Sequence, residues 1–533
     1  MPGTVFGLLE GAARDAPDAT AIHYGGAQLT WRELADLARR AAGGLAALGV
    51  GEGDRVAFWL PNTVAYVAAY FACAQLGAVS VAVNTRYRAK EVADIVGRSG
   101  AKVLILWPGF RGIDFLSILQ DVPNEALSRL EHVVLYGEEG AQPDAPAKLA
   151  QKSLTSWSAL IAAEAHPVDA GSPSHGCNMF TTSGTTSAPK FVFHEQRSIV
   201  QHAEELRTNM APLIGDGALL QTLPFCGVFG FTSIVLAVAA KKQMVITSAF
   251  DARETIRLVD AHNVRYFSAT DDMVMAMLDA DSRPHAMPRL TAIGFGAFNA
   301  SPEELAERAA ARGVRLLGLY GMSEVMALYA RRDPKEPDDS RVLGGGHVVS
   351  PGADVRVRHP DTGELCPHGE SGELEIRGPS LMAGYFENPQ ATAAAFTDDG
   401  YLRTGDLGYT TGEGEFVYLT RMGDTLRLGG FLVSPVEIEA HLAEHPNVEG
   451  AQVVSVRIGD TTRAYAFVVT AEGQAIDASA LGKHCADALA RFKVPIAFQA
   501  LDAFPTTKGA NGTKIQRARL RDMAQAAVDE GEQ

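Results

Sequence analysis

Helix and strand patterns alternate through about the first 320 residues of this 533-residue chain. Residues 30–49 carry apolar side chains at helical three- and four-residue steps, and Thr30 with Glu33 forms a capping box at the start. A buried-strand pattern at 55–60 follows, and then an apolar helix at about 63–76. This alternation predicts an α/β fold with mostly parallel strands, because parallel strands are joined through crossover segments. Further expected strands lie at 78–83, 103–107, 244–246, 266–268, 292–295 and 316–319.

The sequence changes after about residue 340, where Gly and Pro become frequent and the strand patterns shorten. A chain of this length is too long for one compact core, so at least two domains are expected. We expect a large multi-layer N-terminal α/β domain at 1–421, which includes a β-rich subdomain at about 340–421. A hinge at 422–425 would connect it to a small, mobile α+β C-terminal domain at 426–533. In that domain the patterns predict helices at about 435–444 and 478–491, and strands at 448–456 and 464–469.

The formal net charge of −16 argues against non-specific binding to nucleic acid or to anionic lipid. The five cysteines are scattered and include no CxxC pair, a pattern typical of reduced thiols in a cytoplasmic protein. The apolar run at 234–240 is too short to cross a bilayer, and no basic N-terminal segment suggests a signal peptide. We therefore expect a cytoplasmic protein without a membrane span.

The segment from Thr182 to Lys190 contains five hydroxyl side chains, one Gly and one Lys within nine residues. Hydroxyl groups, free backbone N–H groups and a mobile cation are the parts that bind a polyphosphate. The segment is not a Walker A loop, because no second Gly precedes the Lys and no Ser or Thr follows it. Taken alone, such a run is more typical of a polar surface turn, so its interpretation depends on motifs elsewhere in the chain.

Four further motifs follow in order. Residues 320–324 come directly after an expected strand, at a carboxyl end where ligands bind in open α/β sheets. Their Tyr could stack on a base, and their Glu could hold Mg²⁺. Asp406 lies in a Thr-Gly-Asp turn, where one carboxylate can accept from both hydroxyls of a ribose, although alone it would indicate an Asx turn. The last two motifs are 421–439, with Gly429 and Gly430, and 505–517, with Lys514.

With these five motifs in this order, the chain resembles the adenylate-forming superfamily of acyl-CoA synthetases, nonribosomal peptide synthetase adenylation domains and beetle luciferases. The resemblance covers essentially the whole chain and implies a two-step reaction. A carboxylate attacks the α-phosphorus of MgATP, giving an acyl-adenylate and pyrophosphate. A thiol, usually that of coenzyme A, then displaces AMP. Such chemistry depends on positioning and on charge neutralisation more than on covalent help from the protein.

The resemblance implies a role for each motif. Glu324 would ligate Mg²⁺, and Ser323 would contact the α-phosphate. Lys514 would bridge the substrate carboxylate and the α-phosphate, since a point cation on a flexible stem can follow migrating charge. Gly423 stands at the hinge position, where Gly permits rotation of the C-terminal domain. The other implied contacts are Thr182, Ser183, Gly184, Thr185, Thr186 and Lys190 with the β- and γ-phosphates, Tyr320, Gly296, Ala297 and Phe298 with adenine, Asp406 and Arg421 with the ribose, and Gly429 and Gly430 with coenzyme A.

Three positions depart from the usual spelling of the family. Ser187 and Phe191 stand where the phosphate loop commonly has Gly, and the sequence gives no physical reason for Phe191. Extra residues at 508–511 make Lys508 a competitor of Lys514, although the Gly-x-Lys-Ile spelling favours Lys514. Gly227 replaces a frequent His, which would leave space for a bulky acyl group.

The acid is expected to be apolar and to lack an amino group. The amino-acid-activating branch places an Asp just after the aromatic motif, whereas this chain has Phe231, Thr232 and Ser233 there. A buried ammonium without a partner would be costly. Fatty, aryl and alicyclic acids all suit an apolar pocket, and fatty acid metabolism is one expected setting. Candidate pocket residues are Gly227, Phe229, Phe231, Phe295, Met322 and Met326, several of which could equally be plain core.

Alternatives to an ATP-dependent acid–CoA ligase stay open at this point. An enzyme that passes the acyl group to a carrier-protein thiol would share every motif, and a luciferase-type oxidation would need a specialised substrate. A non-catalytic nucleotide-binding homologue belongs to a different class of function. The intact set of Lys190, Glu324, Asp406 and Lys514 argues against that loss of activity. The expected partners are a small carboxylic acid, ATP, Mg²⁺ and coenzyme A, and a homodimer is compatible with the sequence.

Overall fold

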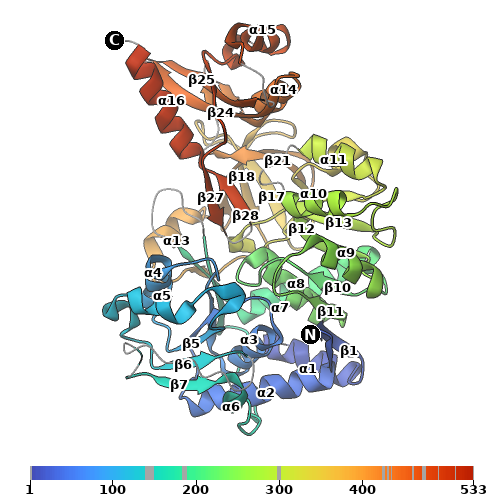
Figure 1. Ribbon diagram of the computed structural model, residues 1–533, viewed down its shortest axis with the longest axis vertical. Helices are drawn as coiled ribbons and strands as arrows, with labels where there is room; N and C mark the ends of the chain where they lie inside the picture. The colour runs from blue at the N-terminus through green and yellow to red at the C-terminus, as the bar shows by residue number, and fades with distance from the viewer. Residues whose placement is uncertain are drawn as a thin grey trace.

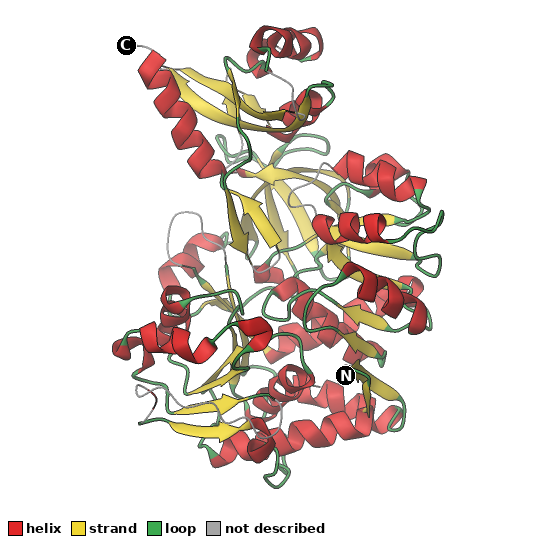
Figure 2. Cartoon of the chain, viewed as in Figure 1, coloured by secondary structure: helices red, strands yellow, loops and turns green. Residues whose placement is uncertain are grey.

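Two large β-sheets and a smaller C-terminal group of elements make up the protein, seen here in a computed structural model (Figures 1 and 2). Helices pack around and between the sheets. The structure describes residues 3–137, 149, 151–182, 189–296, 302–422, 426–428, 431–433, 435–458, 461–470, 476–489, 491–509 and 512–531.

The first large sheet has eight strands. Its strands run parallel except at one end, where two antiparallel strands complete it. In sheet order the strands are β19 (Gly384–Tyr385), β9 (Phe191–Glu195), β8 (Gly176–Thr181), β4 (Val79–Ala82), β3 (Arg55–Trp59), β5 (Val103–Leu106), β6 (His132–Leu135) and β7 (Ser153–Ser156).

The second large sheet has thirteen strands and joins two kinds of pairing. One half is mostly parallel, as expected for the alternating region, and the other half is antiparallel. The strands of the β-rich segment therefore continue the ladder of the parallel strands. In sheet order they are β17 (Asp354–Arg358), β18 (Gly372–Arg377), β20 (Leu402–Gly412), β21 (Glu415–Arg421), β16 (Gly345–Val348), β15 (Ala330–Arg331), β14 (Leu316–Tyr320), β13 (Ala292–Gly296), β12 (Tyr266–Thr270), β10 (Leu219–Gln221), β11 (Met244–Ile246), β1 (Thr20–Tyr24) and β2 (Ala27–Thr30).

Local signals account for the main helices. In α2 (Trp31–Ala47) the predicted capping box is present, with Thr30 and Glu33 each accepting from the other's backbone N–H. In α3 (Val64–Leu76) nearly every side chain is buried, as is typical of a helix that is apolar all round. The remaining helices before residue 422 are α1 (Val5–Asp15), α4 (Ala89–Ser99), α5 (Phe115–Asp121), α6 (Trp157–Leu160), α7 (Gln196–Ile214), α8 (Val228–Ala240), α9 (Ala252–Ala261), α10 (Asp271–Ala280), α11 (Pro302–Ala311), α12 (Asp338–Arg341) and α13 (Pro389–Ala395).

The largest hydrophobic cluster lies between the two large sheets. It contains Val56 and Phe58 from β3, Ile22 from β1, and side chains of α3 and α8. Burial of these helices against both sheets fixes the sheets relative to each other. The apolar run at 234–240 is thus part of a core helix, and no helix in the described part of the chain has the length and apolar character that a membrane span needs.

The elements after residue 425 have their own hydrophobic cores. Two clusters consist only of residues from this part, around Leu426 and Val453 in one and Phe467 and Leu520 in the other. Figure 1 shows most of these elements at one end of the molecule, with β27 and β28 nearer its middle. They are β22 (Leu426–Leu428), β23 (Phe431–Val433), α14 (Pro435–Ala443), β24 (Val448–Ile458), β25 (Thr461–Thr470), α15 (Ala478–Ala488), β26 (Phe498–Ala500), β27 (Thr506–Gly509), β28 (Gly512–Ile515) and α16 (Arg517–Gly531).

The expected mixed α/β architecture with a small C-terminal α+β part is therefore confirmed. Helix α15 ends at Ala488, three residues before the expected end, because Leu489 takes an extended backbone. The domain boundaries stay a prediction, since Gly423 and its two successors lie outside the described residues.

Candidate functional site

The ends of the hydroxyl-rich segment meet between β8 and β9. The backbone N–H of Thr182 donates to the carbonyl of Lys190 at 3.0 Å, and the Lys190 N–H donates to Oγ1 of Thr182 at 3.3 Å. The segment thus leaves the sheet as the loop of a β-hairpin, and Lys190 stands at its base. Within that loop, Ser183, Gly184, Thr185, Thr186 and Ser187 lie outside the described residues.

Phe191 supports the base of this loop, which gives the structural reason that the sequence lacked. Its side chain is buried in the core of the eight-stranded sheet, and the guanidinium of Arg98 lies 4.5 Å from the centre of its ring. Arg98 Nη2 also donates to the carbonyl of Pro189 at 2.6 Å. The aromatic ring therefore positions an arginine that holds the end of the loop.

Tyr385 connects Lys190 to Glu324. The Nζ atom of Lys190 lies 4.7 Å from the centre of the Tyr385 ring, and the Tyr385 hydroxyl donates to Oε1 of Glu324 at 2.9 Å. Tyr385 lies on β19 at the edge of the eight-stranded sheet, whereas Glu324 follows β14 of the other sheet. One side chain thus joins the two sheets at the proposed phosphate end of the site.

The chain turns sharply after β14, which places Ser323 and Glu324. A Cβ on Gly321 would lie 2.6 Å from the backbone carbon of Ala327, so only Gly allows this close return of the chain. The Glu324 carbonyl accepts from the N–H of Met382 at 2.8 Å. The Ser323 carbonyl lies 2.7 Å from Nε2 of His194. These contacts hold the backbone of the turn that carries Glu324, and the Glu324 residue is buried.

His194 is neutral near pH 7, because burial lowers the pKa of its imidazole to about 4. A neutral ring that donates from Nε2 to the Ser323 carbonyl positions the turn without adding a charge beside Glu324.

Asp406 lies between Tyr320 and Arg421. The Tyr320 hydroxyl donates to Oδ2 of Asp406 at 2.6 Å, and Nε of Arg421 lies 3.1 Å from Oδ1. Arg421 faces Asp406 directly in the β20–β21 ladder, and its Nη1 donates to the carbonyl of Thr404 at 3.0 Å. The Asp406 carboxylate therefore contacts side chains of two other motifs, which an Asx turn would not require.

The electrostatics of Asp406 are unusual for a carboxylate beside an arginine. Burial raises its pKa, the Arg421 charge and the Tyr320 hydroxyl oppose that rise, and the negative charges of Glu324 and Glu373 add to it. Its Oδ1 is buried and receives no hydrogen bond within the described part of the chain, although the Arg421 guanidinium is near. A buried acceptor oxygen of this kind suits a ligand hydroxyl.

The ring of Tyr320 packs against two aromatic side chains of β21. Phe416 meets it edge-on at 5.0 Å between ring centres, and Tyr418 lies at 5.7 Å. Burial strongly raises the pKa of Tyr320, so its hydroxyl stays protonated as the donor to Asp406. Stacking of this ring on adenine stays a prediction. Gly296 ends β13, one residue beyond the expected strand, and Ala297 and Phe298 lie outside the described residues.

The candidate acyl-pocket residues divide into two groups. Phe231, Phe295 and Met326 are fully buried in hydrophobic cores, with the Phe231 ring against Tyr70 and Phe180. Their core packing accounts for these three positions. Gly227 is also buried, as the N-cap of α8, whereas Phe229 and Met322 are only partly buried. Phe229 and Met322 are therefore the members that a ligand could reach.

The C-terminal lysine motif forms a β-hairpin. Lys514 of β28 faces Thr507 of β27, and Lys508 faces Thr513. Figure 1 shows the hairpin extending from the C-terminal elements toward the larger part of the molecule. The positions of the Lys508 and Lys514 side chains lie outside what the structure describes, and so do Gly429 and Gly430. Next to the hairpin, Arg517 pairs with Glu439 of α14 through two contacts of 2.7 and 2.8 Å.

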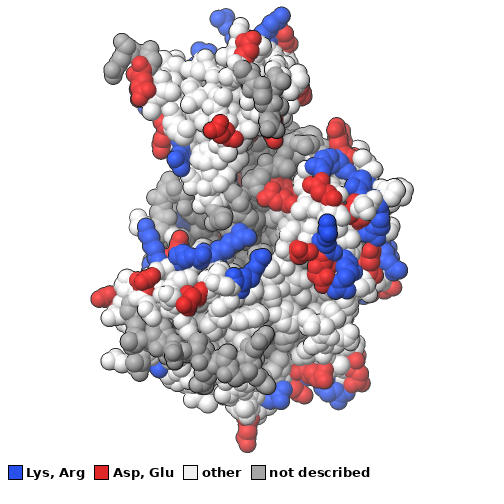
Figure 3. All heavy atoms as spheres, viewed as in Figure 1, with Lys and Arg blue, Asp and Glu red and all other residues white. Residues whose placement is uncertain are grey.

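A hollow lies between the C-terminal part and the larger part of the molecule (Figure 3). Lys and Arg side chains line its lower edge in this view, although the chain as a whole is acidic. A local positive field of this kind favours the approach of an anionic ligand.

Sequence reasoning missed Tyr385 and His194. Neither belongs to the five motifs, and no spacing in the sequence relates them to Glu324. The nearest local signal to Tyr385 is a helix start three residues later, where Asn388 is the N-cap and Pro389 the first residue of α13. That signal marks the end of a connecting segment but does not point to Glu324.

Comparisons with known proteins agree with this arrangement. The chain matches the family model for AMP-binding enzymes at residues 9–386 and that for the C-terminal domain of AMP-binding enzymes at residues 437–510. It is 30% identical, over 98% of its length and 99% of the relative, to a 3-[(3aS,4S,7aS)-7a-methyl-1,5-dioxo-octahydro-1H-inden-4-yl]propanoyl:CoA ligase of Mycobacterium tuberculosis. It is 31% identical, over 96% of both chains, to a feruloyl-CoA synthase of Amycolatopsis. A solved O-succinylbenzoate coenzyme A synthetase of Bacillus subtilis in complex with ATP and magnesium ion superposes with a TM-score of 0.79 at 24% identity, covering 96% of this chain and 98% of that one.

Proposed function

Because the chain belongs to the AMP-binding enzyme family and its full-length relatives include AMP-forming acid–CoA ligases, we propose that it activates an apolar carboxylic acid without an amino group and transfers it to coenzyme A. In the first step a carboxylate oxygen bonds to the α-phosphorus of ATP, and the bond to the leaving pyrophosphate breaks. In the second step the thiol sulfur bonds to the acyl carbon, the bond to the AMP oxygen breaks, and the thiol proton is lost. No redox change occurs in either step.

The convergence of Lys190, Glu324 and Asp406 is the observation that carries this proposal. They are 134 and 82 residues apart in sequence (324 − 190 and 406 − 324), yet Tyr385 joins the first two and the charge of Glu324 acts on the pKa of Asp406. A cation, a carboxylate and an acceptor for hydroxyls are the groups that phosphates, Mg²⁺ and a ribose need.

The described residues fit a magnesium ion at Glu324. Its carboxylate is an oxygen ligand, the Tyr385 hydroxyl occupies Oε1, and Oε2, to which no described residue donates, would suit a hard cation that keeps most of its water ligands. Bound Mg²⁺ would supply charge neutralisation between phosphate oxygens. Tyr385 would hold the carboxylate in one orientation and keep Lys190 over its ring.

At the other end of the site, Asp406 would accept from the ribose hydroxyls. The Tyr320 hydroxyl holds one carboxylate oxygen and Arg421 stands beside the other, so the acceptor is positioned before ATP binds. Lys514, on the hairpin, would move with the C-terminal part and contact the α-phosphate during the first step only.

An apolar acid is supported by the side chains near Glu324. The hydroxyl of Thr232 donates to the Met326 carbonyl, and the single hydroxyl proton of Ser233 lies between two acceptors, the Gly230 carbonyl and Oε1 of Gln221, so both hydroxyls are used within the protein. No carboxylate stands among residues 228–233 to meet an amino group. The two relatives named above act on acids that contain rings, which places alicyclic and aryl acids beside fatty acids as substrates to test.

The test is a screen for pyrophosphate release with fatty, aryl, alicyclic and amino acids, each with and without coenzyme A. We expect release with an apolar acid and formation of its acyl-CoA thioester when coenzyme A is added. Adenylation without thioester formation would contradict the choice of coenzyme A. No release with any acid would contradict catalysis itself.

Lys514→Ala tests the division of labour between the two steps. We expect adenylation to fall by about 10²–10³-fold, because one preorganised charge is lost, while thiol attack on supplied acyl-adenylate largely survives. Lys508→Ala is the matched control, since it removes the other lysine of the same hairpin and should leave both steps near the wild-type rate. Equal loss of both steps in Lys514→Ala would contradict the proposed role.

A further inference from the structure

Three consecutive residues directly after the Glu324 turn have a left-handed backbone. They are Met326, Ala327 and Leu328, here called the left-handed segment, and their φ angles are 58°, 53° and 36°. None of the three is Gly, and a left-handed backbone brings the Cβ of an L-residue too close to the following carbonyl oxygen, so each residue adds strain. Strain of this kind persists only where surrounding contacts hold the backbone in place.

Backbone hydrogen bonds connect the left-handed segment to the residues before it. The N–H of Met326 donates to the Ser323 carbonyl at 3.3 Å. The N–H of Ala327 donates to the Met322 carbonyl at 3.0 Å. Glu324 lies within the loop that these two bonds close, so a change in the backbone of the left-handed segment would also move its carboxylate.

A hydroxyl group from a distant part of the chain holds the left-handed segment. Oγ1 of Thr232, on α8, donates to the carbonyl of Met326 at 2.5 Å, and the two residues are 94 positions apart in sequence. Thr232 is fully buried, so solvent does not compete for its hydroxyl. The same helix carries Phe229, a candidate acyl-pocket residue, so α8 connects the acyl side of the site with the turn that carries Glu324.

His202 of α7 also lies near the Met326 carbonyl but does not replace Thr232. Burial, and to a smaller extent His194, lowers the pKa of the His202 imidazole to about 3, while the carbonyl opposes that shift, so the ring is neutral near pH 7. Neither ring nitrogen of His202 makes a hydrogen bond within the described part of the chain. Among the described side chains, Thr232 is therefore the donor to this carbonyl.

We propose that Thr232 is a positioning residue for adenylation, because its hydrogen bond to Met326 keeps the left-handed segment in place. The segment in turn places Ser323 and Glu324, whose roles toward the phosphates and Mg²⁺ rest on the proposed function. Thr232 acts through the turn and does not itself contact a reacting group. Without its hydroxyl the segment should relax toward ordinary backbone angles, and the Glu324 carboxylate should shift from its place beside Tyr385.

The first experiment needs no substrate. Hydrogen exchange, followed by mass spectrometry, is measured for the peptide 320–330 of the apo protein. Thr232→Val keeps the shape of the side chain and removes its hydroxyl, so exchange in this peptide should become about 10-fold faster. Thr255→Val is the matched control, since Thr255 is equally buried on α9 and its hydroxyl makes no hydrogen bond within the described structure. It should exchange as the wild type does, and unchanged exchange in Thr232→Val would overturn the proposal.

The second experiment measures pyrophosphate release with an acid that the wild type uses, after circular dichroism has confirmed that each variant is folded. Thr232→Val should lower kcat about 10-fold and leave KM for the acid near the wild-type value, because the displaced Glu324 serves the transition state and not the binding of the acid. Thr232→Ser, which restores the hydroxyl, should recover most of the rate. Ala327→Gly added to Thr232→Val should also recover much of it, because Gly adopts the left-handed backbone without strain.

The outcomes separate this proposal from the proposed function. A wild-type kcat in Thr232→Val, an equal loss in Thr255→Val, or no recovery in either rescue variant would overturn the positioning role. Absence of pyrophosphate release in the wild type itself would contradict the proposed function and with it a role in adenylation. The exchange experiment would then still decide whether Thr232 holds the left-handed segment.

Discussion

Two buried carboxylates on neighbouring strands of the thirteen-stranded sheet have opposite surroundings. Glu375 of β18 is fully buried and lies between two guanidiniums. Arg356 contacts it at 2.6 Å, and Arg358 contacts it at 2.8 and 3.1 Å, so both oxygens are occupied. Asp406 of β20 is also buried, but its Oδ1 receives no hydrogen bond among the described residues.

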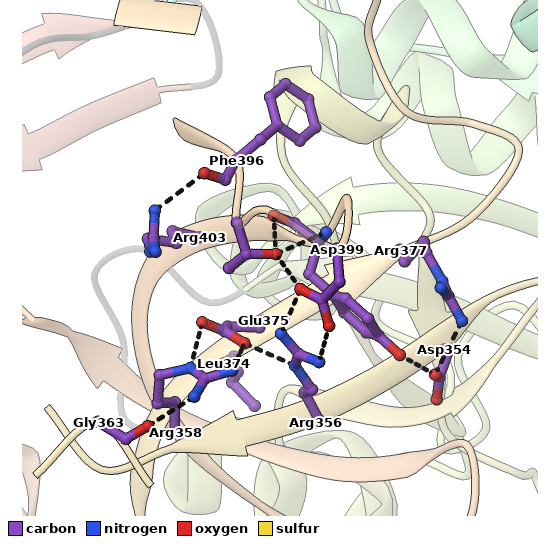
Figure 4. A network of polar contacts seen from close by, with 12 residues as sticks. Asp354, Arg356, Arg358, Gly363, Leu374, Glu375, Arg377, Phe396, Asp399 and Arg403 are labelled. Carbon is purple, nitrogen blue, oxygen red and sulfur yellow. Dashed lines mark hydrogen bonds and ion pairs between the residues drawn. The ribbon is translucent and has the colours of Figure 1, made fainter. Parts of the chain in front are cut away.

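Figure 4 shows how the surroundings of Glu375 are completed. Arg356 also pairs with Asp399, and its guanidinium lies 3.7 Å from the centre of the Tyr401 ring. Burial alone would raise the pKa of Glu375, but the two arginines hold it below its ordinary value. The pKa of Asp406 is raised instead, because one arginine does not offset its burial.

The difference separates a structural carboxylate from one that is prepared for a ligand. A buried charge whose hydrogen bonds are all made within the protein contributes to the fold, and removing it leaves its partners unpaired. A buried acceptor oxygen that is paired with a charge but receives no hydrogen bond can still accept from an outside donor. The expected effects of mutation on stability and activity should therefore be opposite at Glu375 and Asp406.

The largest expected effect is on stability at Glu375. Glu375→Gln should lower the free energy of unfolding by about 3 kcal/mol, because Arg356 and Arg358 lose a buried counter-charge. The activity per folded molecule should stay near that of the wild type. Denaturant unfolding followed by circular dichroism measures the first quantity, and initial rates below the unfolding transition measure the second. An unchanged free energy of unfolding in Glu375→Gln would contradict the structural role of Glu375.

Asp406→Asn should lower the activity and leave the stability of the protein intact, the reverse of Glu375→Gln. Loss of a charged acceptor for the ribose should lower kcat/KM for ATP by about 10–100-fold. The apo protein should be at least as stable as the wild type, since the amide still accepts from Tyr320 and the half-exposed Arg421 can turn to water. Pyrophosphate release at varied ATP concentration, beside the same unfolding experiment, gives both values. Destabilisation comparable to that of Glu375→Gln would place Asp406 among the structural carboxylates.

A smaller effect is expected at Tyr385, which links the two sheets. Tyr385→Phe removes the hydroxyl that holds Glu324 but keeps the ring beneath Lys190, so the adenylation rate should fall by up to about 10-fold. The dependence on Mg²⁺ concentration should shift upward in the same assay. Tyr465→Phe is the control, because its hydroxyl donates to Gln499 in the C-terminal part, away from Glu324. Equal losses in the two variants would contradict a specific role for Tyr385.

The pH dependence of stability should also differ between Glu375 and Asp406. The folded pKa of Glu375 is lowered, so its contribution is present above the unfolded value of 4.5 and is lost as the pH falls through the folded value. The folded pKa of Asp406 is raised, so ionisation there costs stability as the pH rises above 3.8. On acidification to about pH 3.5, the deficit of Glu375→Gln should shrink, and any advantage of Asp406→Asn should shrink as well. Unfolding curves of the three proteins across this range would test both signs.

The smallest effect is expected at Asp399, the exposed outer member of the Glu375 network. Its side chain is 56% exposed, so water can replace it as the partner of Arg356. Asp399→Asn should leave the unfolding temperature and the activity within experimental error. A marked loss of stability would show that the network depends on the exposed Asp399 as much as on the buried Glu375.

Much of the fold could be predicted from local pattern. The capping box of Thr30 and Glu33 marks the start of α2, and the short apolar runs at 55–60 and 316–319 became β3 and β14. The five motifs also indicated which segments would meet. The continuity of the thirteen-stranded sheet was not visible in the same way, because β16 pairs with β21, a strand that is distant in sequence.

Sequence motifs supplied the residues of the candidate site, whose roles stay predictions, but no motif indicated how those residues contact one another. Tyr320 was expected to contact adenine through its ring, which stays a prediction, and the structure adds a hydrogen bond from its hydroxyl to Asp406. Tyr385, which joins Lys190 to Glu324, had no pattern to identify it. Phe191 had no explanation until its packing with Arg98 was seen.

The sequence by itself determined the kinds of elements, their order and the chemical groups available, because hydrophobic periodicity, capping and motif spacing act over a few residues. Only the tertiary structure decided which of those groups share a site and which carboxylates are already satisfied. Burial of the helices between the two sheets brings strands from distant parts of the chain together, and that long-range packing sets the hydrogen bonds and pKa shifts of Glu375 and Asp406.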